Sequence, residues 1–369
     1  MSPVADGGPV SQIDRLAGPR GRRMAAVLAG AWRQTPPPLE MSPEALDDVT
    51  LGLLRSKAGA LAWWRIRRSS LGTSPAGILL REAYNNHGLM TAVHAGNLTQ
   101  VMRTLRAGGV DPILVKGPVI GRLYPERGLR PFEDFDLCVR PADFRGAAAI
   151  LAGWGDAHSP VDLHQGFPEF PEPSWDDVYA RSQLITFGGT EVRVPGPEDH
   201  LRLLCLHQMR HGMPKPLWLC DVAVVLESRA KTFDWDLALG RDRRQADWVA
   251  CAIGLANQLL GVSVDDTPVA DRAMHLPKWL VSSVLAGWGA QCPADYQPPQ
   301  LTPNVRGLLA RAPQTIRQYW PSPVAASVHL RRPFSNFPRM PIQVVDACWR
   351  LVRFSFRRLT GRGPGIDPH

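Results

Sequence analysis

The sequence lacks any apolar run of the roughly 18 to 20 residues that a helix needs to cross a bilayer. The apolar stretch at 24–32 is too short for a signal peptide, and no small-residue cleavage site follows it. The six cysteines stand singly, without a C-x-x-C pair, which argues against a cysteine-rich zinc or redox site. We therefore expect a soluble cytoplasmic protein whose cysteines are small core residues in a reducing compartment.

Lysine is scarce, since only five lysines accompany 37 arginines, and we attribute this mainly to coding bias. Acidic residues are scarce in the last fifth of the chain. Residues 301–369 hold eleven arginines and two acids, whereas the rest of the chain is nearly balanced, so the net charge of +8 arises from this segment. A basic segment attracts phosphate, nucleic acid, an acidic partner or an anionic membrane surface, and by itself it does not choose between them.

The 369 residues, 44% of them apolar, suffice for two or three packed cores. The first forty residues are rich in Gly, Pro and Arg, and Ser42-Pro43-Glu44 then has the pattern of a helix start. The longest helical pattern covers 75–107 and ends at Gly108-Gly109. We divide the chain into a flexible segment at 1–40, a helical region at 41–110, an α/β core at 111–196, and a helical region with a basic tail at 197–369.

The core alternates strands and helices. Short apolar or alternating runs predict five strands, at 113–115, 135–139, 161–164, 184–187 and 191–194. Gly188-Gly189 predicts a hairpin between the last two strands. The expected fold class is α+β, with a small mixed sheet flanked by N- and C-terminal helical regions.

Asp134-Phe135-Asp136 is the strongest candidate for chemistry. Residues i and i+2 of a strand project from the same face, so Asp134 and Asp136 are expected to converge on one point. Two adjacent carboxylates repel each other unless a cation lies between them, and such hard oxygen donors suit Mg²⁺. Asp162 lies on the next predicted strand and joins the pair if the two strands are neighbours.

Cationic residues precede these acids along the chain. Lys116-Gly117 stands at a strand-to-helix junction, where backbone amides and a glycine without Cβ can approach a phosphate closely. Arg127 and Arg130 lie on the loop that leads to the acids, where a guanidinium can hold phosphate oxygens with two hydrogen bonds.

These residues resemble a bacterial family of nucleotidyltransferases related distantly to the polymerase-beta-type nucleotidyltransferases. The family combines an "LKG…LYP…GLRP…DIDLLV" block with a following "DLH" strand, and a weaker likeness continues over 201–226. The matching stretches in this chain are Ile113-Leu114-Val115-Lys116-Gly117, Leu123-Tyr124-Pro125, Gly128-Leu129-Arg130-Pro131, Asp134-Phe135-Asp136-Leu137 and Val161-Asp162-Leu163-His164.

The resemblance implies a polymerase-beta-like core that transfers a nucleoside monophosphate from an NTP to an acceptor, with Mg²⁺ or Mn²⁺ as cofactor. By this analogy Asp134 and Asp136 hold two metal ions, while Asp162 shares one of them and helps to deprotonate the acceptor. The triphosphate would be held by Lys116, the Gly117 amide and Arg130. Lys116-Gly117 replaces the Gly-Ser usual in the wider superfamily, so a hydroxyl contact to phosphate is missing.

The acceptor expected here is a peptide, a protein or a small molecule. Two alternatives stay open: a scaffold that has lost catalysis and acts as a binding or regulatory protein, and an RNA-directed enzyme that uses the basic tail. His207 and His211, one helical turn apart, are structural, orient a ligand or bind zinc. His164 either supports the metal site or is a core histidine. The pattern at 342–359 predicts a helix with an apolar and a basic side. This helix either packs on the rest of the protein, covers the cleft, or binds an acidic peptide or nucleic acid.

Overall fold

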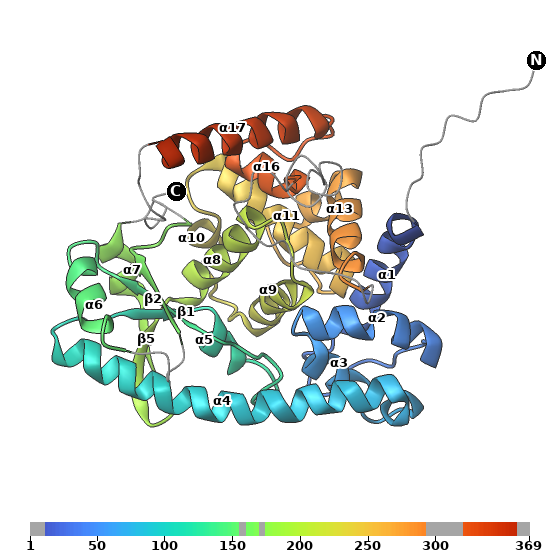
Figure 1. The fold of residues 1–369 in the computed structure, drawn as a ribbon, viewed down its shortest axis with the longest axis horizontal. Helices are drawn as coiled ribbons and strands as arrows, with labels where there is room; N and C mark the ends of the chain where they lie inside the picture. Colours follow the sequence, from blue (N-terminus) through green and yellow to red (C-terminus); the bar gives the residue numbers. More distant parts are fainter. Residues whose placement is uncertain (1–11, 155–159, 170–173, 293–319, 360–369) are drawn as a thin grey trace, which may run out of the picture.

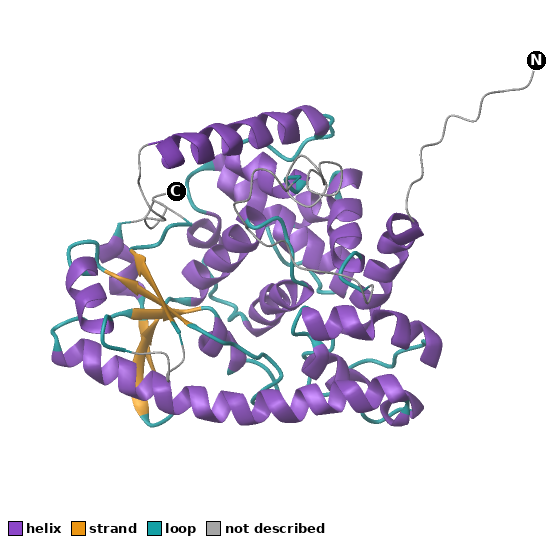
Figure 2. Cartoon of the chain, in the orientation of Figure 1, coloured by secondary structure: helices purple, strands orange, loops and turns teal. Residues whose placement is uncertain are grey.

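The computed structural model describes residues 12–154, 160–169, 174–292 and 320–359 (Figure 1). The described chain combines many helices with one small sheet that lies towards one end of the molecule (Figure 2). The predicted α+β class is confirmed. None of the described helices has both the length and the apolar character that crossing a bilayer requires.

The sheet is mixed. Its order is β3-β2-β1-β5-β4; β2 pairs with β3 and β1 with β5 in parallel, while β1–β2 and β4–β5 are antiparallel. All five predicted strands are present, and β4 and β5 form the predicted hairpin. The strands are β1 (Ile113–Val115), β2 (Phe135–Val139), β3 (Val161–Gln165), β4 (Gln183–Phe187) and β5 (Thr190–Val194).

The N-terminal helices begin where local signals place them. The Ser42 hydroxyl accepts a hydrogen bond from the Ala45 amide and caps α2, and Ser74 caps α4 in the same way. The predicted helix over 75–107 is confirmed with both ends. The elements are α1 (Gln12–Leu28), α2 (Pro43–Arg55), α3 (Gly59–Ile66), the 3₁₀ turn η1 (Ser70–Thr73) and α4 (Pro75–Ala107).

Within the segment 1–40, which is expected to be flexible, residues 12–28 form the helix α1, in which Met24 and Leu28 are fully buried. α1 packs closely on α13 because glycines stand where the two backbones meet: a Cβ on Gly21 or Gly289 would collide with a carbonyl group of the other helix. Glycine content, which suggested flexibility, here permits close helix packing. Residues 1–11 lie outside the described part of the chain.

The remaining helices surround the sheet and extend away from it (Figure 1). The helices within the α/β core are α5 (Gly117–Gly121), α6 (Phe144–Leu151) and α7 (Trp175–Arg181). Those after it are α8 (Pro197–Arg210), α9 (Pro216–Ser228), α10 (Trp235–Leu239), α11 (Arg243–Leu260), α12 (Ala270–Met274), α13 (Lys278–Gly289), α16 (Pro323–His329) and α17 (Met340–Leu359). The predicted basic tail beyond Leu359 falls outside the described residues.

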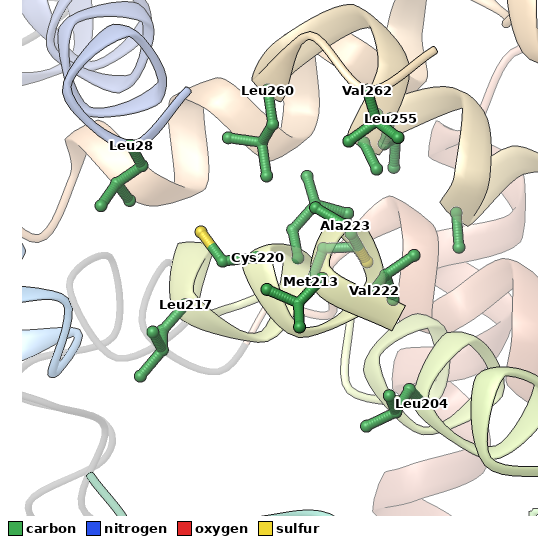
Figure 3. Close-up of a cluster of buried hydrophobic side chains, with 14 of the residues drawn as sticks. Leu28, Leu204, Met213, Leu217, Cys220, Val222, Ala223, Leu255, Leu260 and Val262 are labelled. Atoms are coloured by element: carbon green, nitrogen blue, oxygen red, sulfur yellow. The ribbon is translucent and has the colours of Figure 1, made fainter. Parts of the chain in front are cut away.

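Two apolar clusters form the interior. The larger one joins N-terminal and C-terminal helices in a single core; Leu28 of α1, Cys220 of α9 and Leu260 of α11 meet there (Figure 3). The smaller one lies between the sheet and the second half of α4. α4 contributes Leu80 to the larger cluster and Leu98 to the smaller one, so this long helix ties the sheet to the helical body.

Candidate active site

The strand register brings two of the three predicted acids together. Asp136 of β2 stands directly opposite Asp162 of the parallel strand β3. Paired residues in neighbouring strands project from the same face of a sheet, and His164, two residues further along β3, shares that face. Asp136, Asp162 and His164 each offer a ligand atom, and these atoms lie within 4.8 Å of one another. The predicted adjacency of the two strands is confirmed.

Asp136 lies at the centre of this group. Its Oδ1 accepts hydrogen bonds from Lys116 Nζ at 2.8 Å and from His164 Nε2 at 3.1 Å. His164 Nε2 is also 3.3 Å from Asp162 Oδ2, so the imidazole bridges both carboxylates. Burial disfavours the charged form of Asp136, but His164 and Lys116 outweigh it and hold the pKa of this carboxyl far below its usual range. Asp136 is therefore ionised at neutral pH.

Asp134, the third predicted acid, lies directly before the strand that carries Asp136. β2 begins at Phe135, so Asp134 precedes the strand and is not part of the three-residue group. It still lines the same cavity. Loss of hydration and the neighbouring Asp136 carboxylate raise the pKa of Asp134 above its usual value. A cation near Asp134 would stabilise its ionised form and so lower this pKa.

Lys116 sits in a backbone conformation that L-residues rarely adopt, with φ 56° and ψ −131°. Its amide donates a hydrogen bond to Nε2 of His200, a fully buried ring on α8, at 3.1 Å. This contact holds the junction between β1 and α5. Burial favours the neutral amine, but Asp136 and Glu169 raise the pKa of Lys116. Gly117 follows, and a Cβ there would come within 3.0 Å of Phe132 Cβ.

Arg130, predicted as a phosphate ligand, is engaged elsewhere. Its Nε and Nη2 donate to the Asp221 carboxylate of α9, with the shortest contact at 2.7 Å, and both side chains are buried. Tyr124 donates to the same carboxylate at 2.9 Å. Arg130 therefore joins the loop before β2 to α9, and its Nη1 donates to the Pro131 carbonyl at 3.1 Å. Arg127, on the same loop, is exposed and does not line the cavity.

The acids open into a cavity of about 590 Å³ between the sheet and the helices α8 and α9. We call it the sheet–helix cavity. All six predicted site residues line it: Lys116, Gly117, Arg130, Asp134, Asp136 and Asp162. The other wall carries His207 and Gln208 of α8, His211 directly after it, and Lys215 and Trp218 at the start of α9.

Sequence reasoning missed the carboxylate that pairs with His207. Glu169, after β3, has a side chain only 6% exposed, and its Oε1 accepts a hydrogen bond from His207 Nδ1 at 2.9 Å. Burial raises the pKa of Glu169, but this bond together with the charges of Lys116 and the nearby histidines lowers it to about 2. The His207 ring lies 4.5 Å from that of His211 and 5.0 Å from that of Trp218. In the described chain neither histidine belongs to a cluster that could hold a metal, so zinc finds no support here.

Gln208 and Lys215 also escaped the sequence analysis. Gln208 is 1% exposed, and neither its amide nitrogen nor its amide oxygen has a hydrogen-bond partner among the described residues. A buried amide without a partner is costly, so a polar ligand would gain from meeting it. No local pattern marks either residue, because each acquires its environment only when α8 and α9 pack against the sheet.

A family model described as "uncharacterised nucleotidyltransferase" matches residues 53–261. The chain belongs to this family. The matched part of this nucleotidyltransferase begins in α2 and ends directly after α11, so it includes the whole sheet and both walls of the cavity. The expected membership of a nucleotidyltransferase family is thereby confirmed. No curated protein and no solved structure matches the chain.

Proposed function

We propose that this nucleotidyltransferase uses a divalent metal to move a nucleoside monophosphate from an NTP to a peptide, protein or small-molecule acceptor. The observation that carries the proposal is the position of Asp136 opposite Asp162, with His164 beside both, at the mouth of a cavity that Lys116 and Gly117 also line. Carboxylates from neighbouring strands can hold metal ions that share their coordination shell with phosphates.

The donor set fits a hard divalent cation. Asp136 and Asp162 supply oxygen ligands, as Mg²⁺ and Mn²⁺ prefer, and the His164 nitrogen is better tolerated by Mn²⁺. Asp134 lines the same cavity and is able to complete the shell. When bound, the metal supplies positive charge next to the reacting phosphate. Lys116, which donates a hydrogen bond to Asp136 in this structure, fixes the orientation of that carboxylate.

In the reaction, a bond forms between the acceptor oxygen or nitrogen and the α-phosphorus, and the α–β phosphoanhydride bond breaks. Pyrophosphate leaves with the electron pair of the bridging oxygen. The acceptor proton passes to the Asp162 carboxylate, whose side chain is 57% exposed and so accessible to an incoming acceptor. The Gly117 amide and the Lys116 ammonium face the phosphates from the junction of β1 and α5.

Arg130 has a positioning role in this proposal. Its ion pair with Asp221 joins the loop before β2 to α9 and so sets the width of the cavity. Nε and Nη2 of Arg130 donate to Asp221 and Nη1 donates to the Pro131 carbonyl, so the proposal gives Arg130 no direct phosphate contact.

The proposal is tested by incubating the protein with each of the four NTPs, labelled at the α-phosphate, together with Mg²⁺ or Mn²⁺ and a panel of peptide, protein and metabolite acceptors. We expect labelled product that depends on metal and is lost in Asp136→Asn. Binding of metal–NTP without transfer to any acceptor would instead favour a scaffold that has lost catalysis.

A further inference from the structure

Three of the five lysines of this arginine-rich chain line the sheet–helix cavity. Lys116 is paired with Asp136, and Lys57 forms an ion pair with Glu133. Lys215 has no ion pair within the described parts of the chain. A lysine ammonium is a compact charge with three donors, and it suits a phosphate in a confined site. Lys215 is therefore the lysine of this cavity that an anion can use.

Lys215 is held at the wall by its surroundings. It precedes α9, a thirteen-residue helix whose N-terminus has no side-chain cap, and its Nζ lies 5.0 Å from the centre of the Trp218 ring. Burial and the nearby Lys57 lower the pKa of Lys215 by more than Glu133 and Asp134 raise it. The positive end of the α9 dipole adds to the attraction for an anion at this wall.

A second observation points to a ligand at the same wall. Gln208 belongs to the face of α8 that lines the cavity together with Leu204, His207 and His211. Its buried amide nitrogen has no acceptor among the described residues. Buried polar groups are almost always paired, so we expect the Gln208 amide to donate a hydrogen bond to a bound molecule.

The remaining charges of the cavity are divided between its walls. Lys57, Lys116, Arg130 and His207 are each paired with an acid. Asp134 and Asp162 at the sheet then have no lysine or arginine partner in the described chain, while Lys215 and Arg210 lie at the helix wall. A metal-bound polyphosphate would match this distribution of charge. Its cation would bind the acids at the sheet, and its negatively charged outer phosphates would lie at the helix wall.

We propose that Lys215, assisted by the Gln208 amide, binds the outer phosphates of the NTP, which leave as pyrophosphate. The inference rests on the proposed function and deepens it, because it places the leaving group against α8 and α9 rather than at Arg130. The phosphates of a phosphorylated acceptor share this chemistry, and the experiment separates the two sources.

The test measures binding of inorganic pyrophosphate and of inorganic phosphate, each with Mg²⁺, by calorimetry. Lys215→Met removes the charge and keeps the alkyl chain on Trp218; Lys215→Arg keeps the charge; Lys231→Met alters an exposed lysine outside the cavity. We expect Lys215→Met to weaken pyrophosphate binding at least about tenfold, as loss of a close charge pair does. Lys215→Arg should restore most of the affinity, and Lys231→Met should match the wild type.

The inference is overturned if Lys215→Met, folded as judged by its melting curve, binds pyrophosphate as tightly as the wild type. It is also overturned if Lys215 affects inorganic phosphate alone, because the site would then serve a phosphorylated acceptor. If the wild type transfers label but Lys215→Met binds pyrophosphate normally, only this inference is refuted. If Lys215→Met weakens pyrophosphate binding but the wild type transfers no label, only the proposed function is refuted.

Discussion

Asp136 and Asp162 face each other across two parallel strands, and the imidazole of His164 lies within 3.3 Å of both carboxylates. The two acids differ in their surroundings. Asp136 is 11% exposed at its side chain and is held by Lys116, whereas Asp162 is 57% exposed. The buried carboxylate is thus fixed in place, and the exposed one is accessible to an acceptor.

The exposure of Asp162 makes Asp162→Asn a clean test of its role. We expect nucleotidyl transfer to fall by about 10² to 10⁴, the range for loss of a general base. Stability should change by less than about 0.5 kcal/mol, because the side chain is exposed and amide replaces carboxylate at equal size. Rates and thermal melting of the variant check both parts. Asp271→Asn, at an exposed acid of α12, is the control; transfer retained in Asp162→Asn would remove this residue from the site.

Gln208→Leu tests whether the unpaired amide of Gln208 contacts a bound nucleotide. Leaving an amide unpaired costs about 1–3 kcal/mol, so leucine at this position should raise the melting temperature. The same change should weaken NTP binding about fivefold to tenfold, the value of one polar contact. Gln245→Leu is the contrast, because Gln245 accepts a hydrogen bond from Arg202 and its loss should destabilise the protein. If NTP affinity is unchanged in Gln208→Leu, the unpaired amide does not contact the nucleotide.

His200 gives the fold a pH dependence of known sign. Burial, together with the nearby Arg122 and Arg130, lowers the pKa of His200 to about 3. In the unfolded chain the pKa of histidine is near 6.5, so between these values the unfolded state binds one more proton. His200 therefore reduces stability as the pH falls below about 6.5, by up to roughly 1.4 kcal/mol per pH unit.

His200→Gln should remove this part of the pH dependence, because the glutamine oxygen can accept the Lys116 amide hydrogen bond without a titrating ring. Chemical denaturation at pH 7.5, 6.0 and 5.0 measures it. We expect the loss of stability on acidification to be smaller in the variant than in the wild type. Equal losses in the two proteins would show that His200 is protonated in the folded state.

Much of the fold follows from local signals. Ser42 and Ser74 mark helix starts, and alternating or fully apolar runs mark the five strands. The acids of β2 and β3 could be placed together because neighbouring strands bring residues of the same face into contact. The start of β2 is set by its pairing with β3, which begins at Phe135, one residue after Asp134.

The helical wall of the site could not be predicted. Glu169 meets His207 across 38 residues, and Arg130 meets Asp221 across 91. Such contacts depend on how α8 and α9 pack on the sheet and leave no periodic trace in the sequence. α1 is a related case, since Gly21 matters through its contact with α13 and not through local flexibility.

The contact between α1 and α13 yields a stability prediction with a control on the same helix. Gly289→Ala should destabilise the protein by about 1–3 kcal/mol or more, because the added methyl group collides with the Ala17 carbonyl. Gly287→Ala has no atom within 4 Å of the new Cβ and should stabilise α13 by up to about 1 kcal/mol. Chemical denaturation measures both; a neutral Gly289→Ala would place α1 away from α13.

We propose that the protein transfers the α-phosphate with its nucleoside and releases the other two phosphates as pyrophosphate. This is measured with one NTP, labelled either at the α- or at the γ-phosphate, together with metal and an acceptor that the protein uses. We expect the α-label to move to the acceptor and the γ-label to appear in pyrophosphate, in equal amounts. Transfer of the γ-label to the acceptor would instead show a kinase and rule out nucleotidyl transfer.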